Sequence, residues 1–190
     1  MEQSNVSSVR SVALENSSVI SQVVWITTFG LLTAIGAQIE IPHQPVPYTL
    51  QTMFVLLSGA LLGRRNGAIS QLLYLTAGLI GIPVFSGFGF GLARLLGPTG
   101  GYLLAFPVAA FVVGYLIDHK VHVLRTIIAM LSGLFVIFSL GTLQLQFVYY
   151  HDWSAAFANG FLIFSWWDII KLSAAVGFYH QFSRLRKGRS

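Results

Sequence analysis

The sequence predicts an all-α integral membrane protein whose helices cross the bilayer six times. Hydrophobic residues make up 55% of the 190 residues and charged residues only 9%, whereas a soluble domain carries roughly 25% charged residues to solvate its surface. The mean hydropathy is +0.73. The apolar runs also lack the sustained polar–apolar alternation of barrel strands. Helices are therefore expected, because lipid offers no hydrogen-bond partner for a bare backbone amide.

Six apolar runs define the predicted spans. A spanning helix needs about 20 mostly apolar residues, with a range of about 17–25. The second run is short, so either it is tilted within protein surroundings or the preceding loop completes its depth. Residues 1–18 are expected to form a polar cytoplasmic tail, residues 19–183 the membrane domain, and residues 184–190 a basic cytoplasmic tail. The runs lie at residues 19–39, 49–63, 67–84, 99–117, 124–148 and 157–182.

The basic residues give this predicted topology a direction. With six spans, nine of the eleven Lys and Arg residues fall on one side of the membrane, and the positive-inside rule identifies that side as cytoplasmic. We therefore expect a multi-pass protein of the cell membrane with both termini inside. The loops near residues 40–48, 85–98 and 149–156 then face outward. The nine cations are Arg10, Arg64, Arg65, Lys120, Arg125, Arg184, Arg186, Lys187 and Arg189.

Lys171 lies inside the last apolar run, three residues after Asp168. On a helix, positions i and i+3 share a face. Ionisable residues at membrane depth are costly, usually face the protein interior or a wet cavity, and often mark a substrate path. Two structural alternatives stay open: the two charges neutralise one another, or Ser165 and Asp168 form an S-x-x-D capping pattern that starts a helix. A helix start near Ser165 would place both charges near the outer surface.

Two predicted outward loops have unusual compositions. In the first, Pro42, Pro45 and Pro47 remove backbone donors and favour a stiff, extended path. In the second, residues 87–91 read Gly-Phe-Gly-Phe-Gly, and more glycines follow in residues 97–102. Glycines at this density permit positive φ angles and close approach of the backbone to a ligand, although a plain flexible loop is the alternative. The topology leaves two cations, Lys171 and Arg94, outside the cytoplasmic group. Arg94 lies between these two glycine segments.

Several classes of function lack their sequence signatures. The basic residues form no stripe interleaved with aromatic residues, so nucleic-acid binding is not expected. The sequence contains neither G-x-S-x-G nor H-E-x-x-H, which argues against the corresponding intramembrane enzymes. It has no cysteine, and its five histidines form no ligand cluster, so we expect no metal, no cofactor and no enzymatic activity. It also lacks G-x-x-x-x-G-K-[ST], the P-loop motif needed to use ATP.

Taken together, several segments resemble the BioY family, the biotin-specific S components of energy-coupling-factor (ECF) vitamin importers. The match covers nearly the whole chain, from about residue 28 to 180. The family commonly has Pro-Gly before the Asp of its last motif, whereas Trp166 and Trp167 stand there in this chain. The matching segments are I-P-H-Q-P-V-P-Y-T-L-Q-T at 41–52, L-S-G-A-L-L-G-R-R-N-G-A-I-S-Q-L-L-Y-L at 57–75, G-L-I-G-I-P-V-F at 78–85, G-P-T-G-G-Y-L at 97–103 and D-I-I-K at 168–171.

The resemblance implies a six-helix fold that holds one biotin molecule near the outer face, with the first outward loop as part of the lid. It also implies that Asp168 and Lys171 contact biotin, because they match the family's D-x-x-K in the last helix. Apolar and aromatic walls would bury the fused rings. Arg94 either meets the ligand carboxylate or is a solvated loop cation. The candidate substrate-binding residues are Asp168, Lys171, Arg94, Thr49, Gln51, Phe85, Ser86 and Tyr102.

The resemblance also supplies an energy source, namely a membrane-embedded coupling subunit and two cytoplasmic ATPase subunits. In the first predicted span, Gly30 and Ala34 form a small-xxx-small pair, which permits close helix approach in lipid. Family members carry an alanine pair of this spacing for contact with the coupling subunit, so Gly30 and Ala34 are candidate docking residues; internal packing is the alternative. The alternative function is a self-sufficient secondary carrier for biotin or another small vitamin, although the two halves show no internal repeat of the kind common in carriers.

Overall fold

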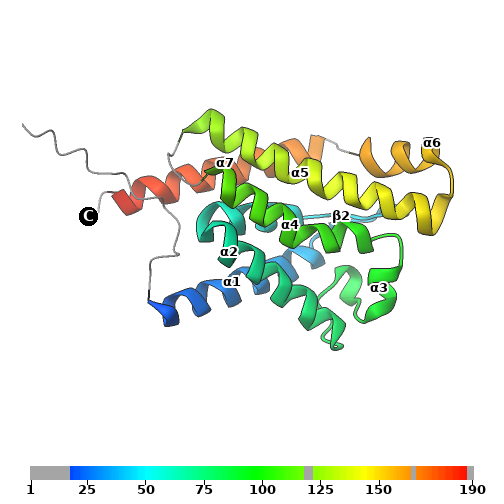
Figure 1. The fold of residues 1–190 in the computed structure, drawn as a ribbon, viewed down its shortest axis with the longest axis horizontal. Coiled ribbons are helices and arrows are strands. Elements are labelled where there is room, and N and C mark those ends of the chain that lie inside the picture. Colours follow the sequence, from blue (N-terminus) through cyan, green and yellow to red (C-terminus); the bar gives the residue numbers. More distant parts are fainter. Residues whose placement is uncertain (1–17, 118–121, 164–165, 188–190) are drawn as a thin grey trace, which may run out of the picture.

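The computed structural model describes residues 18–117, 122–163 and 166–187, and its long helices pack into one bundle (Figure 1). The long helices are α1 (Val19–Gln38), α2 (Gln51–Leu79), α4 (Gly100–Ile117), α5 (Val123–Leu145) and α7 (Trp166–Lys187). The short elements lie in the connections: β1 (Glu40–Ile41), β2 (Tyr48–Thr49), η2 (Ser86–Phe88), α3 (Leu92–Leu96), η3 (Gln146–Tyr150), α6 (Trp153–Ala156) and η4 (Phe157–Phe161).

Helix α2 is two antiparallel helices that reverse direction at Gly63. Gly63 has φ 83° and ψ 174°, a conformation outside the helical region that suits glycine. On either side of it the two halves touch, because a Cβ on Gly67 would lie 2.8 Å from the Gly59 Cα. Further from the turn, Gln71 Nε2 donates to Ser58 Oγ at 3.1 Å. Residues 51–62 and 64–79 therefore correspond to the second and third predicted spans.

The arrangement agrees with the predicted six-helix membrane fold. Of the described helices, three are long and apolar enough to cross a bilayer: Val19–Gln38, Gly100–Ile117 and Val123–Tyr150. A fourth candidate is the pair Trp153–Phe161 and Trp166–Leu185, which is bent by 45°. The two halves of α2 complete the bundle. They are less apolar because α2 packs against α1, α4 and α7 and buries polar side chains within the protein.

The last predicted span differs from the single helix expected over residues 157–182. The π-helical turn η4 ends at Phe161, and α7 begins at Trp166. Ser165, the capping residue of the S-x-x-D pattern, lies outside the described residues. The start at Trp166 places the Asp168 carboxylate in the first turn, where the helix dipole stabilises a negative charge. At its other end, α7 continues to Lys187 and thus includes the first residues of the predicted basic tail.

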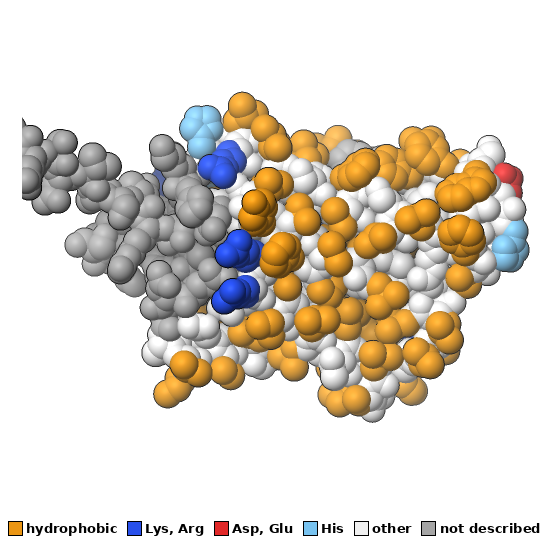
Figure 2. Space-filling view, viewed as in Figure 1, with side chains coloured by type: hydrophobic (Ala, Val, Ile, Leu, Met, Phe, Trp, Pro, Cys, Tyr) orange, Lys and Arg blue, Asp and Glu red, His pale blue; other side chains and the backbone are white. Residues whose placement is uncertain are grey.

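Large apolar side chains cover the outside of the bundle (Figure 2). Examples are Leu31 on α1, Leu104 on α4 and Phe135 on α5, which are 59%, 51% and 63% exposed. A soluble domain would bury such residues, so this belt is the lipid-facing surface. Figure 2 shows Lys and Arg side chains at one end of this face and an acidic side chain at the other.

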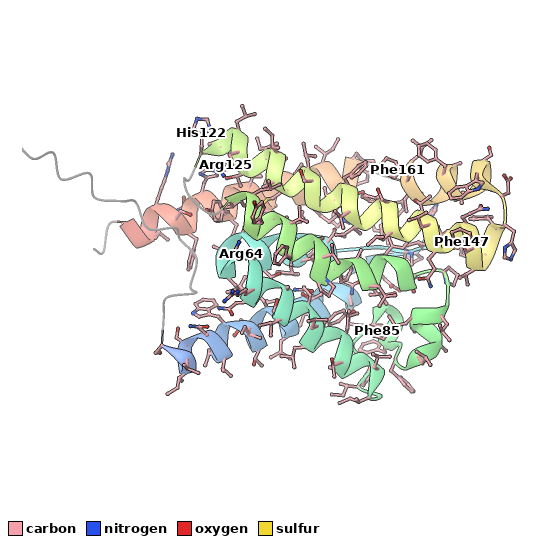
Figure 3. The ribbon with its side chains drawn as sticks, viewed as in Figure 1. Arg64, Phe85, His122, Arg125, Phe147 and Phe161 are labelled. Atoms are coloured by element: carbon pink, nitrogen blue, oxygen red, sulfur yellow. The ribbon has the colours of Figure 1, made fainter. Side chains whose placement is uncertain are left out.

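Arg64 and Arg125, two of the nine cations assigned to the cytoplasmic side, lie where the predicted topology puts the cytoplasm. Arg64 and Arg125 flank the same end of the bundle, opposite Phe147 (Figure 3). That end also holds the α2 reversal and the start of α5. Arg10, Lys120 and Arg189 fall outside the described residues.

The first outward loop is closed by a two-stranded ladder. Glu40 pairs with Thr49 and Ile41 with Tyr48 in antiparallel register. The three prolines lie between the strands, where no ladder donor is needed. Next to the ladder, the Leu50 N–H donates to the carbonyls of Gly36 and Ile39, both at 3.1 Å. These hydrogen bonds attach the loop to the end of α1, and α2 begins directly after it at Gln51.

Candidate functional site

One cavity at the outer end of the bundle is lined by residues from the first outward loop and from β2, α2, η2, α3, α4, α5 and α7. About 650 Å³ inside it is not filled by atoms, a volume that includes the solvent at its open mouth. Most of its wall is apolar or aromatic, and the buried polar groups come from the first outward loop and from the start of α7. The lining residues are Val46, Pro47, Tyr48, Thr49, Gln51, Thr52, Phe85, Ser86, Arg94, Thr99, Tyr102, Leu103, Phe106, Ile137, Phe138, Ile163, Asp168 and Lys171.

An ion pair in the first turns of α7 is the most distinctive feature of the cavity. Lys171 Nζ lies 2.8 Å from Asp168 Oδ1, and the two residues are only 4% and 2% exposed. The ammonium also donates to the Thr49 carbonyl at 3.0 Å and to Thr52 Oγ1 at 2.8 Å. A lysine ammonium has three N–H donors, and each has an acceptor here. Taking two charges out of water is costly unless they are paired and hydrogen-bonded in this way.

These bonds join α7 to a part of the chain about 120 residues earlier. Thr49 belongs to β2, and Thr52 lies in the first turn of α2. Lys171 therefore holds the first outward loop and the start of α2 against α7. The carbonyl and the hydroxyl supply extra acceptors to the ammonium, which compensates part of its desolvation.

A second chain of hydrogen bonds continues from Thr49 across the cavity wall. Thr49 Oγ1 donates to Gln51 Oε1 at 2.9 Å, and Gln51 Nε2 donates to the Tyr74 hydroxyl at 2.5 Å. The Tyr74 hydroxyl in turn donates to the Val84 carbonyl at 3.3 Å. All three side chains are buried, so each polar group has its partner within the protein. The chain fixes the first outward loop relative to the second.

Gln38, at the end of α1, holds the second outward loop from the other side. Its Nε2 donates to the Phe85 carbonyl at 3.0 Å, and its Oε1 accepts from the Phe88 N–H at 3.1 Å. Phe85 is 1% exposed and packs edge-on against Tyr74, with ring centroids 5.6 Å apart. Gly78 leaves the space for this ring (Figure 3 labels Phe85). One aromatic wall of the cavity is thus held by backbone and side-chain bonds.

The opposite wall is formed by α4 and α5. The Tyr102 hydroxyl donates to the Gly160 carbonyl at 2.9 Å, which ties α4 to the turn η4. The Tyr102 ring meets Phe138 edge-on at 6.3 Å, and Phe138 meets Phe161 at 6.4 Å. Rings joined in this way present an apolar surface of fixed shape, since edge-to-face pairs add to the stabilisation from burial.

Arg94 lies at the mouth of the cavity, on the short helix α3. Its side chain is exposed, and the guanidinium lies against Gly89, where a Cβ would come within 3.0 Å of the Arg94 Cζ. Glycine at position 89 thus makes room for the guanidinium. The second outward loop, which is rich in glycine, therefore forms a turn beside Arg94 rather than an open flexible segment.

The structure brings together all eight residues that the sequence proposed for substrate binding, since every one lines this cavity. The sequence did not indicate Thr52, although this residue ends the matching segment at residues 41–52. It also did not indicate the apolar wall formed by Phe106, Ile137 and Phe138. No sequence pattern indicates that Thr52 accepts from Lys171. The apolar wall residues have no distinguishing signal within long apolar runs.

The docking role of Gly30 and Ala34 stays a prediction, and the structure shows how both residues pack within the chain. Gly30 is buried between α1 and α2, where a Cβ would lie 3.3 Å from the Ser70 carbonyl oxygen and 3.8 Å from the Leu73 side chain. Internal packing, the alternative raised by the sequence, explains this glycine because it lets the two helices approach closely. Ala34 is half-buried and packs partly against the core.

Comparisons with known proteins agree with this architecture. A family model described as "BioY family" matches residues 4–188. The biotin transporter BioY of Thermotoga maritima is 43% identical over 77% of this chain and 86% of its own length. The probable biotin transporter BioY of Pyrococcus horikoshii is 45% identical over 80% and 89%.

A solved structure gives the same result for the fold. The crystal structure of the S-component for biotin from an ECF-type ABC transporter superposes with a TM-score of 0.80, covers 92% of this chain and 95% of its own, and is 29% identical. Since the family model spans almost the entire sequence and these relatives match most of it, the chain belongs to the BioY family of integral membrane transport proteins.

Proposed function

We propose that this protein captures biotin in the outer cavity and serves as the S component of an ECF-type importer. The observation that carries the proposal is the buried Asp168–Lys171 pair at one end of a cavity with apolar and aromatic walls. Biotin presents matching chemistry: a polar ureido ring, a fused thioether ring and a carboxylate on a flexible chain. The names of the relatives support this ligand over other vitamins.

The ureido group is the part of biotin that suits the buried pair. The two oxygens of an ionised carboxylate together offer about four acceptor sites, so Asp168 can accept from a ureido N–H while it stays paired with Lys171. Lys171 reaches the ligand by exchanging one of its three present bonds, of which the bond to Thr52 is the one to a side-chain hydroxyl. Phe85 and Tyr102 would then pack against the fused rings, with Thr49, Gln51 and Ser86 nearby.

A ligand panel tests the proposal. The purified full-length protein is titrated with biotin, thiamine and riboflavin under identical conditions by calorimetry. Biotin should bind at least a hundredfold more tightly than the other two, because only biotin pairs a ureido donor with an apolar bicycle. Equal binding of the three vitamins, or no binding of biotin by folded protein, would overturn the assignment.

We further propose that a coupling subunit and two ATPase subunits energise uptake, since the chain itself lacks a P-loop. Under this proposal the protein carries out no covalent chemistry on its ligand. Uptake of labelled biotin in cells without any such partners separates this mechanism from the alternative secondary carrier. Accumulation that persists there, and that collapses with the proton gradient, would favour the carrier.

Arg94 is proposed to pair with the biotin carboxylate at the mouth of the cavity. Arg94→Gln should weaken biotin binding about tenfold, which is the lower range for a charge-assisted hydrogen bond because the side chain is exposed. The methyl ester of biotin, which has no charge, should bind wild type and Arg94→Gln with similar affinity. If the variant weakens both ligands equally, Arg94 shapes the loop and does not read the carboxylate.

A further inference from the structure

A groove at the cytoplasmic end of the bundle lies far from the ligand cavity. It runs between the end of α4 and the start of α5 and is lined by Leu116, His122, Leu124, Arg125, Ile128 and Ala129. Leu124 and Ile128 are 60% and 53% exposed and belong to the apolar outer surface. The groove thus has apolar walls along the membrane and polar groups, Arg125 and His122, at its cytoplasmic end.

Arg125 is held at this end by one hydrogen bond, which uses only one of its five N–H donors. Its Nε donates to the Leu116 carbonyl at 2.6 Å, at the end of α4. A guanidinium carries five N–H donors, and the structure shows no other hydrogen bond from Arg125 to a described residue. The side chain is exposed. A guanidinium that is fixed through one nitrogen and open at the others is prepared to bind an anion.

Arg64 provides a second cation at the same end of α4, outside the residues that line the groove. Its guanidinium lies over the ring of Tyr115, 5.9 Å from the centroid, and Tyr115 immediately precedes Leu116. Its backbone is packed against Gly114, so the α2 reversal places Arg64 at the end of α4. Figure 3 labels Arg64 and Arg125 at this end of the bundle, and Figure 2 shows Lys and Arg side chains along the edge of the apolar surface there.

No negative charge among the described residues balances this pair of arginines. The described acids are Glu40, Asp152 and Asp168, and all three belong to the outer end, in β1, before α6 and in the first turn of α7. The described residues therefore give this end of the apolar groove a net positive charge. Cytoplasmic leaflets carry anionic lipids, whose attraction to a basic residue is worth about 1 kcal/mol.

We infer that this groove binds an anionic phospholipid of the cytoplasmic leaflet. The phosphate lies on Arg125, Arg64 adds positive charge at the same end of α4, and an acyl chain lies along Leu124 and Ile128. Both parts are required, since a soluble anion would leave the apolar wall without a partner. The assignment is independent of the vitamin that the outer cavity binds.

Delipidated full-length protein tests the inference. Binding of short-chain phosphatidylglycerol and of phosphatidylcholine is measured by native mass spectrometry for wild type, for the double variant Arg64→Gln with Arg125→Gln, and for Arg184→Gln. The last variant removes one exposed cation of α7 from outside the groove. Phosphatidylglycerol should bind wild type more tightly than phosphatidylcholine and should bind the double variant more weakly by about fivefold per arginine removed.

The controls separate this site from general surface charge. Arg184→Gln should bind phosphatidylglycerol as wild type does, and glycerol 3-phosphate, which has no acyl chain, should not compete. Thermal unfolding in detergent verifies that each variant is folded, and Arg125→Lys, which keeps the charge, should retain most of the binding. Equal loss in Arg184→Gln, equal binding of the two lipids by wild type, or competition by glycerol 3-phosphate would each overturn the lipid site.

Discussion

Replacing Lys171 with methionine should weaken biotin binding by about a hundredfold and lower the free energy of unfolding by about 3–5 kcal/mol. The substitution keeps the length of the side chain and removes its charge. Asp168, which is 2% exposed, is then a buried carboxylate without its cation. The Thr49 carbonyl and the Thr52 hydroxyl lose their donor as well. Calorimetry with biotin and chemical unfolding in detergent measure the two effects.

A double variant separates binding from stability in this experiment. Asp168→Asn combined with Lys171→Met removes both charges, so no unpaired charge stays buried. Most of the lost stability should return, because a buried ion pair is often replaceable by neutral groups of similar volume, whereas biotin binding should stay weak. Biotin affinity in Lys171→Met equal to that of wild type would show that the pair is purely structural.

Replacing Gly59 with leucine should prevent the formation of a stable bundle. Gly59 lies where residues 51–62 meet α4, and even a Cβ would come within 3.0 Å of the Ala110 carbonyl carbon. These Ala110 atoms belong to the backbone of α4, so the clash cannot be relieved by a side-chain movement. Overpacking of this kind costs typically 1–3 kcal/mol and more where the backbone must shift, and membrane helices depend on close packing at small residues. Size-exclusion profiles and thermal unfolding in detergent give the measurement.

Gly177 provides the matched control for this substitution. It lies in the interior of α7, and a Cβ there would meet nothing within 4 Å. Gly177→Ala should therefore leave the size-exclusion profile unchanged and raise stability by up to about 1 kcal/mol, because alanine favours the helix. Gly59→Leu with the melting temperature of wild type would show that the two helices separate more easily than the structure indicates.

Much of the fold could be predicted because lipid imposes strict rules on the sequence. The positions of Arg64, Arg65 and Arg125 indicated which ends of the helices meet the cytoplasm, and they correctly separated the two halves of α2, which the structure joins at Gly63. The S-x-x-D pattern indicated the start of α7 near residue 165. These signals are local, so a single sequence contains them.

Contacts between distant segments could not be predicted in the same way. Thr52 and Lys171 are 119 positions apart, and a threonine in an apolar run has no feature that marks it as the acceptor for a particular lysine. Gly30 shows a second limit of sequence reasoning. A small residue permits close approach to any helix, and the sequence does not say whether that helix belongs to the same chain. In this structure it is the second half of α2.

The shortness of the helix at residues 51–62 makes bilayer thickness a factor in ligand capture. Twelve residues rise only about 18 Å, whereas the hydrocarbon core is about 30 Å thick. The missing length is filled at the outer end by β2, the first outward loop and the cavity. Under the proposed function, biotin is therefore held within the depth of the outer leaflet. Membranes with longer acyl chains are then expected to change biotin affinity, which titration in liposomes of defined chain length would measure.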